Sequence, residues 1–400
     1  MNCDVPGGVR FLTLLLSCAI LAIWVQQRWA WDLAQAAIFV FAAAWAIRQL
    51  SSPSPVRLHL WLVPLAAAVL WGLVQLSTGR TVYRFATWDA VLIWAAWDAL
   101  FFLALQLFVR SAARHWFLRF AIYFGFALCV VSTVQMFTSG GKIFWRFPSG
   151  YTDFVMGPFV NRNHYAAFME MILPVALWQA LRDEKRAFVH YAMAAAMVAS
   201  VVAAASRAGS VLVCLEILAV LLAAWARGMA PGRTLARTLA GFAVMAVLLI
   251  AGTGWQTLRK RLWDDPDPFA GRREMVESSL AMLHERPVMG FGLGNWARAY
   301  PQYALFDDGD YVNQAHNDWL QWAAEGGWPF LAIQFILAVM VVPAALRSVW
   351  GIGLLSVWVH CLVDYPMQQR PALAAWFFVL LGALAGWQQS HVGRRAGSVD

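Results

Sequence analysis

A histidine and an asparagine, His316 and Asn317, open a predicted helix in a chain that is poor in polar side chains. The first turn of a helix offers unpaired backbone N–H groups, and these favour anions. A histidine there can act as a general base near neutral pH. The alternative for His316 is a local hydrogen bond, and the alternative for Asn317 is a plain helix N-cap.

Three further polar side chains, Asn161, Asn163 and His164, lie together at the start of another predicted helix. Asparagine amides both donate and accept hydrogen bonds, which suits the hydroxyl groups of a sugar. Capping of the helix by Asn161 or Asn163 is an equally good interpretation.

Arginines are the third kind of candidate, and guanidinium groups bind phosphate oxygens bidentately. Arg207 lies at the predicted end of an apolar helix, where a snorkelling interfacial arginine is the alternative. Arg286 precedes Pro287 and could instead be a solvated charge paired with Glu285. Arg272 could simply pair along its own predicted helix.

A glycine run follows, with Gly290, Gly292 and Gly294 alternating before Trp296. Such a run lets the backbone approach a ligand or turn through positive φ. A dinucleotide fingerprint would need a preceding strand and a βαβ unit, which the sequence lacks. By itself the run indicates a tight turn, while Trp296 is a candidate for stacking on a sugar ring.

The composition decides how these residues must be positioned. Hydrophobic residues make up 61% of the 400 residues and charged residues 13%, against roughly 45–50% and 25% in soluble domains. Long, nearly uncharged segments recur at the length that a membrane-spanning helix needs. The sequence therefore predicts an all-α polytopic integral membrane protein with about 12 transmembrane helices. Its net charge of +8 lies mostly in short loops, so we expect no nucleic-acid partner.

The spans are predicted at 11–27, 33–48, 58–76, 90–109, 117–137, 164–181, 188–205, 209–226, 236–251, 319–345, 348–365 and 371–388. An even number places both termini on one side. Most arginines and lysines of the short loops then share that side, which the positive-inside rule assigns to the cytoplasm. Residues 1–400 would form a single membrane domain.

Two long loops, 138–163 and 252–318, would lie on the opposite face. The second carries many charges of both signs, including Arg259, Asp264 and Asp307. Within it, residues 272–285 are expected to form an amphipathic helix with an apolar face of Val276, Leu280 and Leu283.

Taken in order, these motifs resemble the O-antigen ligase and polymerase superfamily of bacterial envelope glycosyltransferases. The resemblance covers about 160–370. The matching segments are Phe159–Ala166, Ser206–Gly209, Gly271–Met275, Glu285–Trp296, Ala315–Gln321 with Glu325-Gly-Gly, and His360–Pro366.

This resemblance implies transfer of a glycan from an undecaprenyl-pyrophosphate carrier to an acceptor hydroxyl at the periplasmic face of the inner membrane. A ligase acting on lipid A–core is the favoured branch. An O-antigen or exopolysaccharide polymerase and a protein O-oligosaccharyltransferase remain alternatives. The expected partners are the lipid-linked glycan, an acceptor glycolipid or polysaccharide, and the bilayer.

The resemblance also assigns roles residue by residue. His316 would be the catalytic base or the group that orients the acceptor hydroxyl. Binding or orienting the glycan would fall to Asn317, Asn161, Asn163 and His164. The pyrophosphate ligands would be Arg207, Arg286 and Arg272. Structural support would come from Glu325 and from His360 and Asp364, which are spaced to share one helix face. We expect no cofactor and no metal, since arginines would do the work of a divalent cation.

A flippase or polysaccharide-lipid transporter is the alternative from another functional class. Glu170 and Glu216 lie inside predicted spans, where carboxylates are costly and often functional. We expect structural pairing for each, for instance with an arginine of another helix. The sequence shows none of the internal repeats that transporters commonly have, and its candidate residues cluster on one face.

Overall fold

The computed structural model describes residues 6–151, 155–229, 232–253, 270–305, 309, 311–368 and 371–396. Within these residues the regular structure is helical apart from one short hairpin, which confirms the all-α polytopic membrane fold. The part of the predicted long loop at 254–269 lies outside the described residues, as does Asp307. The chain divides into two compact units, each built from separate stretches of sequence.

Unit 1 comprises the described parts of Met1–Gln27, Ser111–Pro266 and Pro343–His360. Its elements are α1 (Gly7–Leu21), α5 (Ser111–Thr138), β1 (Lys142–Ile143), β2 (Phe147–Pro148), α6 (Arg162–Arg182), η1 (Glu184–Arg186), α7 (Ala187–Ala203), α8 (Arg207–Ala226), α9 (Gly232–Thr253) and α14 (Ile352–His360). The two strands pair antiparallel, with Lys142 opposite Pro148.

Helix α6 is the centre of unit 1. Nearly all its side chains between His164 and Ala180 are buried, because α5, α7, α8 and α14 pack around it. A Cβ at Gly353 of α14 would lie 2.4 Å from the carbonyl oxygen of Glu170. The lack of a side chain at Gly353 thus lets α14 approach the backbone of α6 closely.

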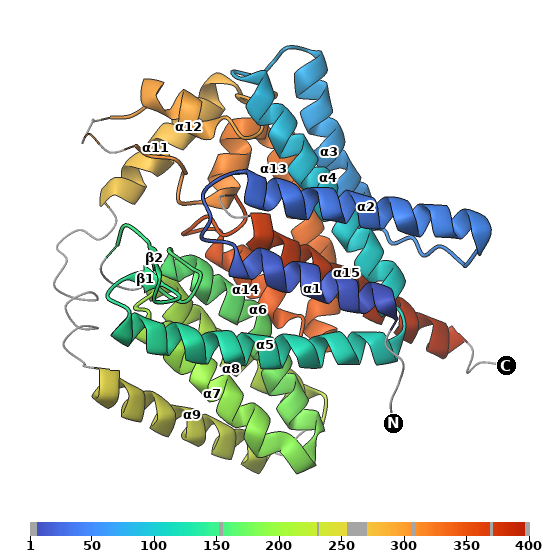
Figure 1. Ribbon diagram of the computed structural model, residues 1–400, viewed down its shortest axis with the longest axis vertical. Coiled ribbons are helices and arrows are strands. Elements are labelled where there is room, and N and C mark those ends of the chain that lie inside the picture. The colour runs from blue at the N-terminus through green and yellow to red at the C-terminus, as the bar shows by residue number, and fades with distance from the viewer. Residues whose placement is uncertain are drawn as a thin grey trace. The chain divides into compact units, whose positions relative to one another are not determined.

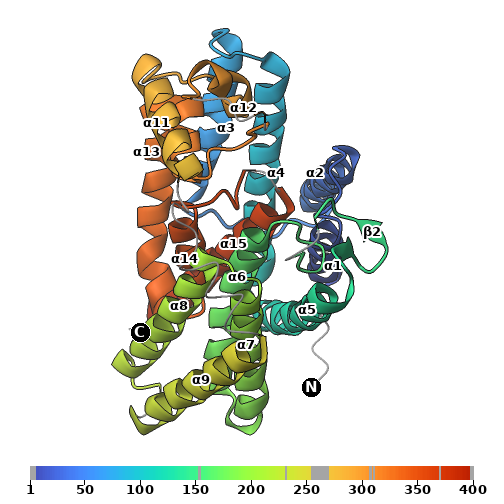
Figure 2. The ribbon, with the colours of Figure 1, turned by 90° about the vertical axis from the view of Figure 1, so that its left-hand side faces the viewer.

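Unit 2 comprises the described parts of Arg28–Arg110, Asp267–Val342 and Cys361–Asp400. Its elements are α2 (Trp29–Ser51), α3 (Leu62–Ser77), α4 (Arg84–Phe108), α11 (Ala270–Glu285), α12 (Trp296–Ala299), η2 (Tyr300–Gln302), α13 (Asp318–Ser348, up to Val342) and α15 (Pro371–Ala396). Helix α4 packs against α2, α3 and α15. Helices α3 and α4 run side by side in Figure 1, and α11 and α12 lie near the same end of this pair in Figure 2.

Each predicted span overlaps a helix within the described residues. Seven of the helices in this part of the chain are long and apolar enough to cross a membrane. Helices α1 and α3 are apolar but shorter. The span predicted at 348–365 is wrong as a continuous helix, because α14 has nine residues and ends at His360. At 1.5 Å per residue it covers less than half of a hydrocarbon core of about 30 Å.

The amphipathic helix predicted at 272–285 is present as α11, but its buried face differs from the prediction. Leu283 is buried, whereas Leu280 is 48% exposed. The buried polar residues Glu274 and Ser278 face the neighbouring η2 segment, with Ser278 donating a hydrogen bond to the carbonyl oxygen of Tyr303. Tertiary hydrogen bonds therefore rotate the helix away from the face that periodicity alone favours.

Substitution of Gly290 tests how tightly the glycine run packs. Gly290 has φ 61°, and a Cβ there would lie 2.4 Å from the backbone carbonyl of Glu325. Gly79 has φ 67° with nothing within 4 Å of its Cβ position. We expect Gly79→Ala to cost about 1–2 kcal/mol of unfolding free energy from backbone strain, and Gly290→Ala to cost about 1–3 kcal/mol more from overpacking.

The measurement is thermal unfolding of both purified variants in the same detergent. Equal losses in melting temperature would show that the approach of Gly290 to Glu325 is looser than the structure has it.

Candidate functional site

His316 lies in unit 2, in the turn that leads into α13. Its φ is 50°, a left-handed conformation that few residues other than glycine adopt. The turn is held on both sides: the backbone N–H of Ala315 donates to Gln321 Oε1 at 3.0 Å, and that of Leu320 donates to Asn317 Oδ1 at 3.0 Å. Asn317 is thus the N-cap of α13, and the surrounding hydrogen bonds hold His316 in a strained conformation.

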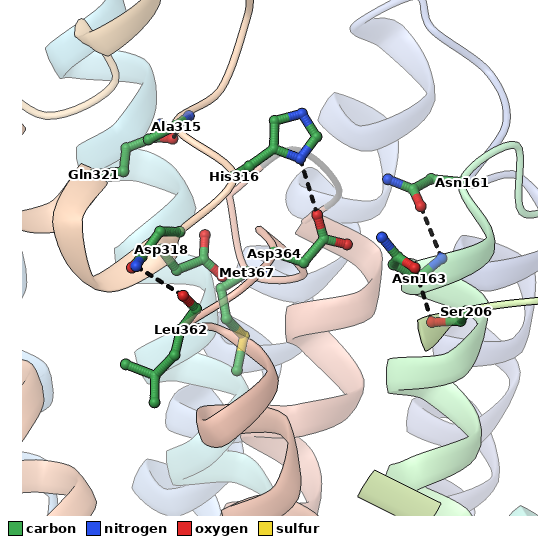
Figure 3. A network of polar contacts seen from close by, with 11 residues as sticks. Asn161, Asn163, Ser206, Ala315, His316, Asp318, Gln321, Leu362, Asp364 and Met367 are labelled. Atoms are coloured by element: carbon green, nitrogen blue, oxygen red, sulfur yellow. Dashed lines mark hydrogen bonds and ion pairs between the residues drawn. The ribbon is translucent and has the colours of Figure 1, made fainter. Parts of the chain in front are cut away.

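The imidazole of His316 pairs with the carboxylate of Asp364. His316 Nδ1 is 3.3 Å from Asp364 Oδ1, and the other ring nitrogen points away from this contact (Figure 3). The side chain of His316 is 29% exposed and that of Asp364 only 1%. A buried carboxylate on Nδ1 favours the tautomer with its proton there, which leaves Nε2 free to accept a proton from a substrate hydroxyl.

The segment that carries Asp364 is tied to the start of α13. The backbone N–H of Asp318 donates to the carbonyl oxygens of Cys361 and Asp364. In return, the backbone N–H of Met367 donates to Asp318 Oδ2 at 2.9 Å. The Asn317 side chain also donates to the carbonyl oxygen of Leu362 at 2.8 Å. These bonds fix Asp364 relative to His316 within unit 2.

The expected sharing of one helix face by His360 and Asp364 is wrong. Helix α14 ends at His360, and Asp364 lies in the turn beyond it. His360 Nδ1 instead contacts Glu170 Oε1 at 2.8 Å, with both side chains fully buried in unit 1. Glu170 therefore has the structural pairing that we expect, with a histidine as its partner in place of an arginine. Glu216 is also buried in unit 1.

The asparagines of the second motif lie in unit 1, where they stabilise helix starts. Asn161 caps α6, with its side chain accepting from the backbone N–H of Asn163 at 2.8 Å. Ser206 caps α8 and donates to Asn163 Oδ1 at 2.8 Å (Figure 3). Arg207 is the first residue of α8, and His164 is buried in α6.

The glycine run offers no cradle for phosphate. Every backbone N–H from Gly290 to Trp296 already donates a hydrogen bond within unit 2. The carboxylate of Glu325 accepts two of them, from Gly294 at 2.9 Å and from Trp296 at 3.1 Å. Gln75 of α3 accepts a third, from Leu293. The run is therefore a turn that is fastened to α3 and α13.

Arg286 lies immediately before this turn and is half exposed. Its guanidinium lies 4.3 Å from the centre of the Phe291 ring, and its Nε is 3.7 Å from Glu285 Oε1. Burial and the neighbouring Glu285 carboxylate raise the pKa of Tyr303 to about 12, so the phenol keeps its proton and donates to Glu285. Phe291 in turn packs edge-on against Tyr303. Arg286 is thus a half-exposed charge held between a carboxylate and an aromatic ring.

The chain was compared with models of known protein families. Residues 192–335 match the family model for O-antigen ligase. Over this segment the chain is similar to that family. A search of curated proteins finds no match to the chain. The family match supports an O-antigen ligase or polymerase function for a multi-pass membrane protein, and it contains Arg207, Arg272, Arg286 and His316.

Sequence reasoning misses two features of the candidate site. Trp296 cannot stack on a sugar, because it is fully buried, donates to Ser279 Oγ and stacks on Tyr300. Asp364 is the orienting partner of His316, although it lies 48 residues away. The sequence showed the histidine and the carboxylate in two separate motifs. Their spacing along the chain could not predict that the two side chains are in contact.

The role of Glu325 is tested by Glu325→Gln. An amide can accept only at its oxygen, so one of the two N–H donors at Gly294 and Trp296 would face an NH₂ group in a buried place. A buried donor left without its acceptor costs about 1–3 kcal/mol. We expect a clear drop in melting temperature in detergent, and more rapid proteolysis of the segment 286–305.

Glu277→Gln is the matched control, since Glu277 is an exposed carboxylate of α11 and should tolerate the change. If both variants unfold at the wild-type temperature, the Glu325 carboxylate does not hold the glycine turn.

Proposed function

We propose that this protein is an O-antigen ligase-type glycosyltransferase. It would move a glycan from undecaprenyl pyrophosphate to an acceptor hydroxyl at the periplasmic face of the bacterial inner membrane, with lipid A–core as the favoured acceptor. The observation that carries the proposal is the His316–Asp364 pair, whose histidine lies in the segment that matches O-antigen ligase.

The proposed reaction is a single displacement. Nε2 of His316 takes the proton of the acceptor hydroxyl while that oxygen attacks the anomeric carbon of the donor. The bond from this carbon to the pyrophosphate oxygen breaks, and undecaprenyl pyrophosphate leaves with the bonding electron pair. Asp364 holds the Nδ1–H and stabilises the imidazolium, which then releases its proton to water. The configuration at the anomeric carbon is inverted.

The charge of the leaving group would be stabilised by arginines rather than by a metal ion. Arg286 is supported by the Phe291 ring, Arg272 lies in the first turn of α11, and Arg207 begins α8. Guanidinium groups keep their charge at any working pH and match phosphate oxygens in pairs. Asn161, Asn163, His164 and Asn317 would bind or orient the sugars.

Reconstitution tests the proposal directly. The protein is placed in liposomes with a lipid-linked glycan and candidate acceptors in the presence of EDTA. We expect glycan transfer with release of undecaprenyl pyrophosphate, and a loss of at least about 10²-fold in rate for His316→Ala. Arg286→Ala should weaken donor use. His284→Ala is the control, because His284 is an exposed histidine of α11 in the same loop.

The acceptor that is consumed identifies the branch: lipid A–core for a ligase, a second glycan for a polymerase, or a protein hydroxyl for an oligosaccharyltransferase. Donor that stays chemically intact but crosses the bilayer would contradict the proposal and favour a flippase.

The orienting role of Asp364 predicts a distinct kinetic result. Asp364→Asn keeps the shape of the side chain but removes the charge that favours the Nδ1–H tautomer. We expect kcat to fall by about 10²-fold or more with little change in KM for the donor. The measurement is initial rates at varied donor concentration. An unchanged kcat would show that Asp364 does not act through His316.

A further inference from the structure

A groove between α3 and α4 in unit 2 has no role in the proposed reaction. It has a volume of about 500 Å³ and is open along one side. The residues that line it are Leu73, Leu76, Ser77, Arg84, Phe85 and Trp88.

The lining is amphipathic. Leucine and aromatic side chains form the walls, Ser77 supplies a hydroxyl, and Arg84 supplies the one charge of the lining. Arg84 is exposed and is the first residue of α4, a helix long and apolar enough to span a membrane. The charge therefore lies at the level of lipid head groups, with the apolar walls extending along the helices toward the hydrocarbon.

Positive charge near the groove is not confined to Arg84. Arg28 lies over the ring of Phe85, 4.7 Å from its centre, and forms an ion pair with Asp89. The start of α4 adds the positive end of a helix dipole. Because Arg28 already has a carboxylate partner while no acidic residue lines the groove, Arg84 is the charge offered to an occupant.

We propose that this groove binds an anionic glycerophospholipid, with one acyl chain along Leu73, Leu76 and Trp88 and the phosphate on Arg84. One guanidinium suits a single phosphate. A lipid-linked pyrophosphate carries more charge and a longer chain than this lining accommodates, and a phosphoglycolipid with several chains would need more polar partners. A zwitterionic head group would bring its own cation to an already positive site.

The lipid would also stabilise the unit. The backbone N–H of Val82 donates to the carbonyl oxygen of Phe291 at 3.0 Å, and that of Tyr83 donates to Asn295 Oδ1 at 3.1 Å. These two residues immediately precede Arg84. A phosphate held by Arg84 would therefore restrain the segment that fastens the glycine run to the α3–α4 end.

The test uses the full-length protein, delipidated in a neutral detergent. Phosphatidylglycerol and phosphatidylcholine with identical acyl chains are added, and retained lipid and melting temperature are measured by native mass spectrometry and thermal unfolding. We expect phosphatidylglycerol to be retained and to raise the melting temperature. Arg84→Gln should weaken its binding by about fivefold, the effect of one basic residue at an anionic lipid surface.

Arg80→Gln is the matched control, because it removes the same charge from the same turn at an exposed residue that does not line the groove. Trp88→Ala should weaken lipid binding because it removes an apolar contact with the acyl chain. Equal effects of Arg84→Gln and Arg80→Gln on lipid binding would overturn the proposal. Equal retention of phosphatidylglycerol and phosphatidylcholine would also overturn it.

Undecaprenyl pyrophosphate and a lipid A-type glycolipid are added in competition arms. Displacement of phosphatidylglycerol by either one at equal concentration would assign the groove to the donor or the acceptor and overturn the proposal. Since lipid retention is measured without glycan transfer, its failure is distinct from a failure of the proposed enzymatic function.

Discussion

The buried carboxylate of Glu325 is the constraint on which the polar end of unit 2 depends. It accepts the backbone N–H groups of Gly294 and Trp296 and so fastens the glycine turn to α13. From that turn, Phe291 reaches Arg286, and Trp296 reaches Ser279 of α11. A further buried carboxylate, that of Glu274, accepts from the Tyr300 hydroxyl and the Leu305 backbone. A loop rich in charges becomes an ordered platform because its buried polar groups are satisfied by one another.

The structure contains two histidine–carboxylate pairs that differ in their exposure to solvent. His360 and Glu170 are fully buried among the helices of unit 1, where their contact satisfies groups that hydrocarbon would otherwise penalise. His316 and Asp364 have the same composition, but His316 is 29% exposed and lies in a strained turn. Of the two pairs, only the second has a partly exposed histidine.

Much of the candidate site could be predicted from the types of its residues and from their order in the sequence. Hydropathy over about 20 residues identifies membrane helices because it is a local property of the chain. It therefore located the helices, including the helix at α2, and the polar loop between α9 and α13. The cap at Asn161 and the helix ending before Pro287 were also accessible, since capping depends on residues within one turn.

What the sequence by itself determined was thus the membrane class, the order of the helices, and the motifs that make the segment 192–335 similar to the O-antigen ligase family. The tertiary structure decided the short length of α14, the buried face of α11, the use of every N–H in the glycine run, and the pairing of His316 with Asp364. Each of these depends on a partner from a distant part of the chain. Local spacing shows which hydrogen-bonding groups a segment carries, but only packing decides which distant group satisfies them.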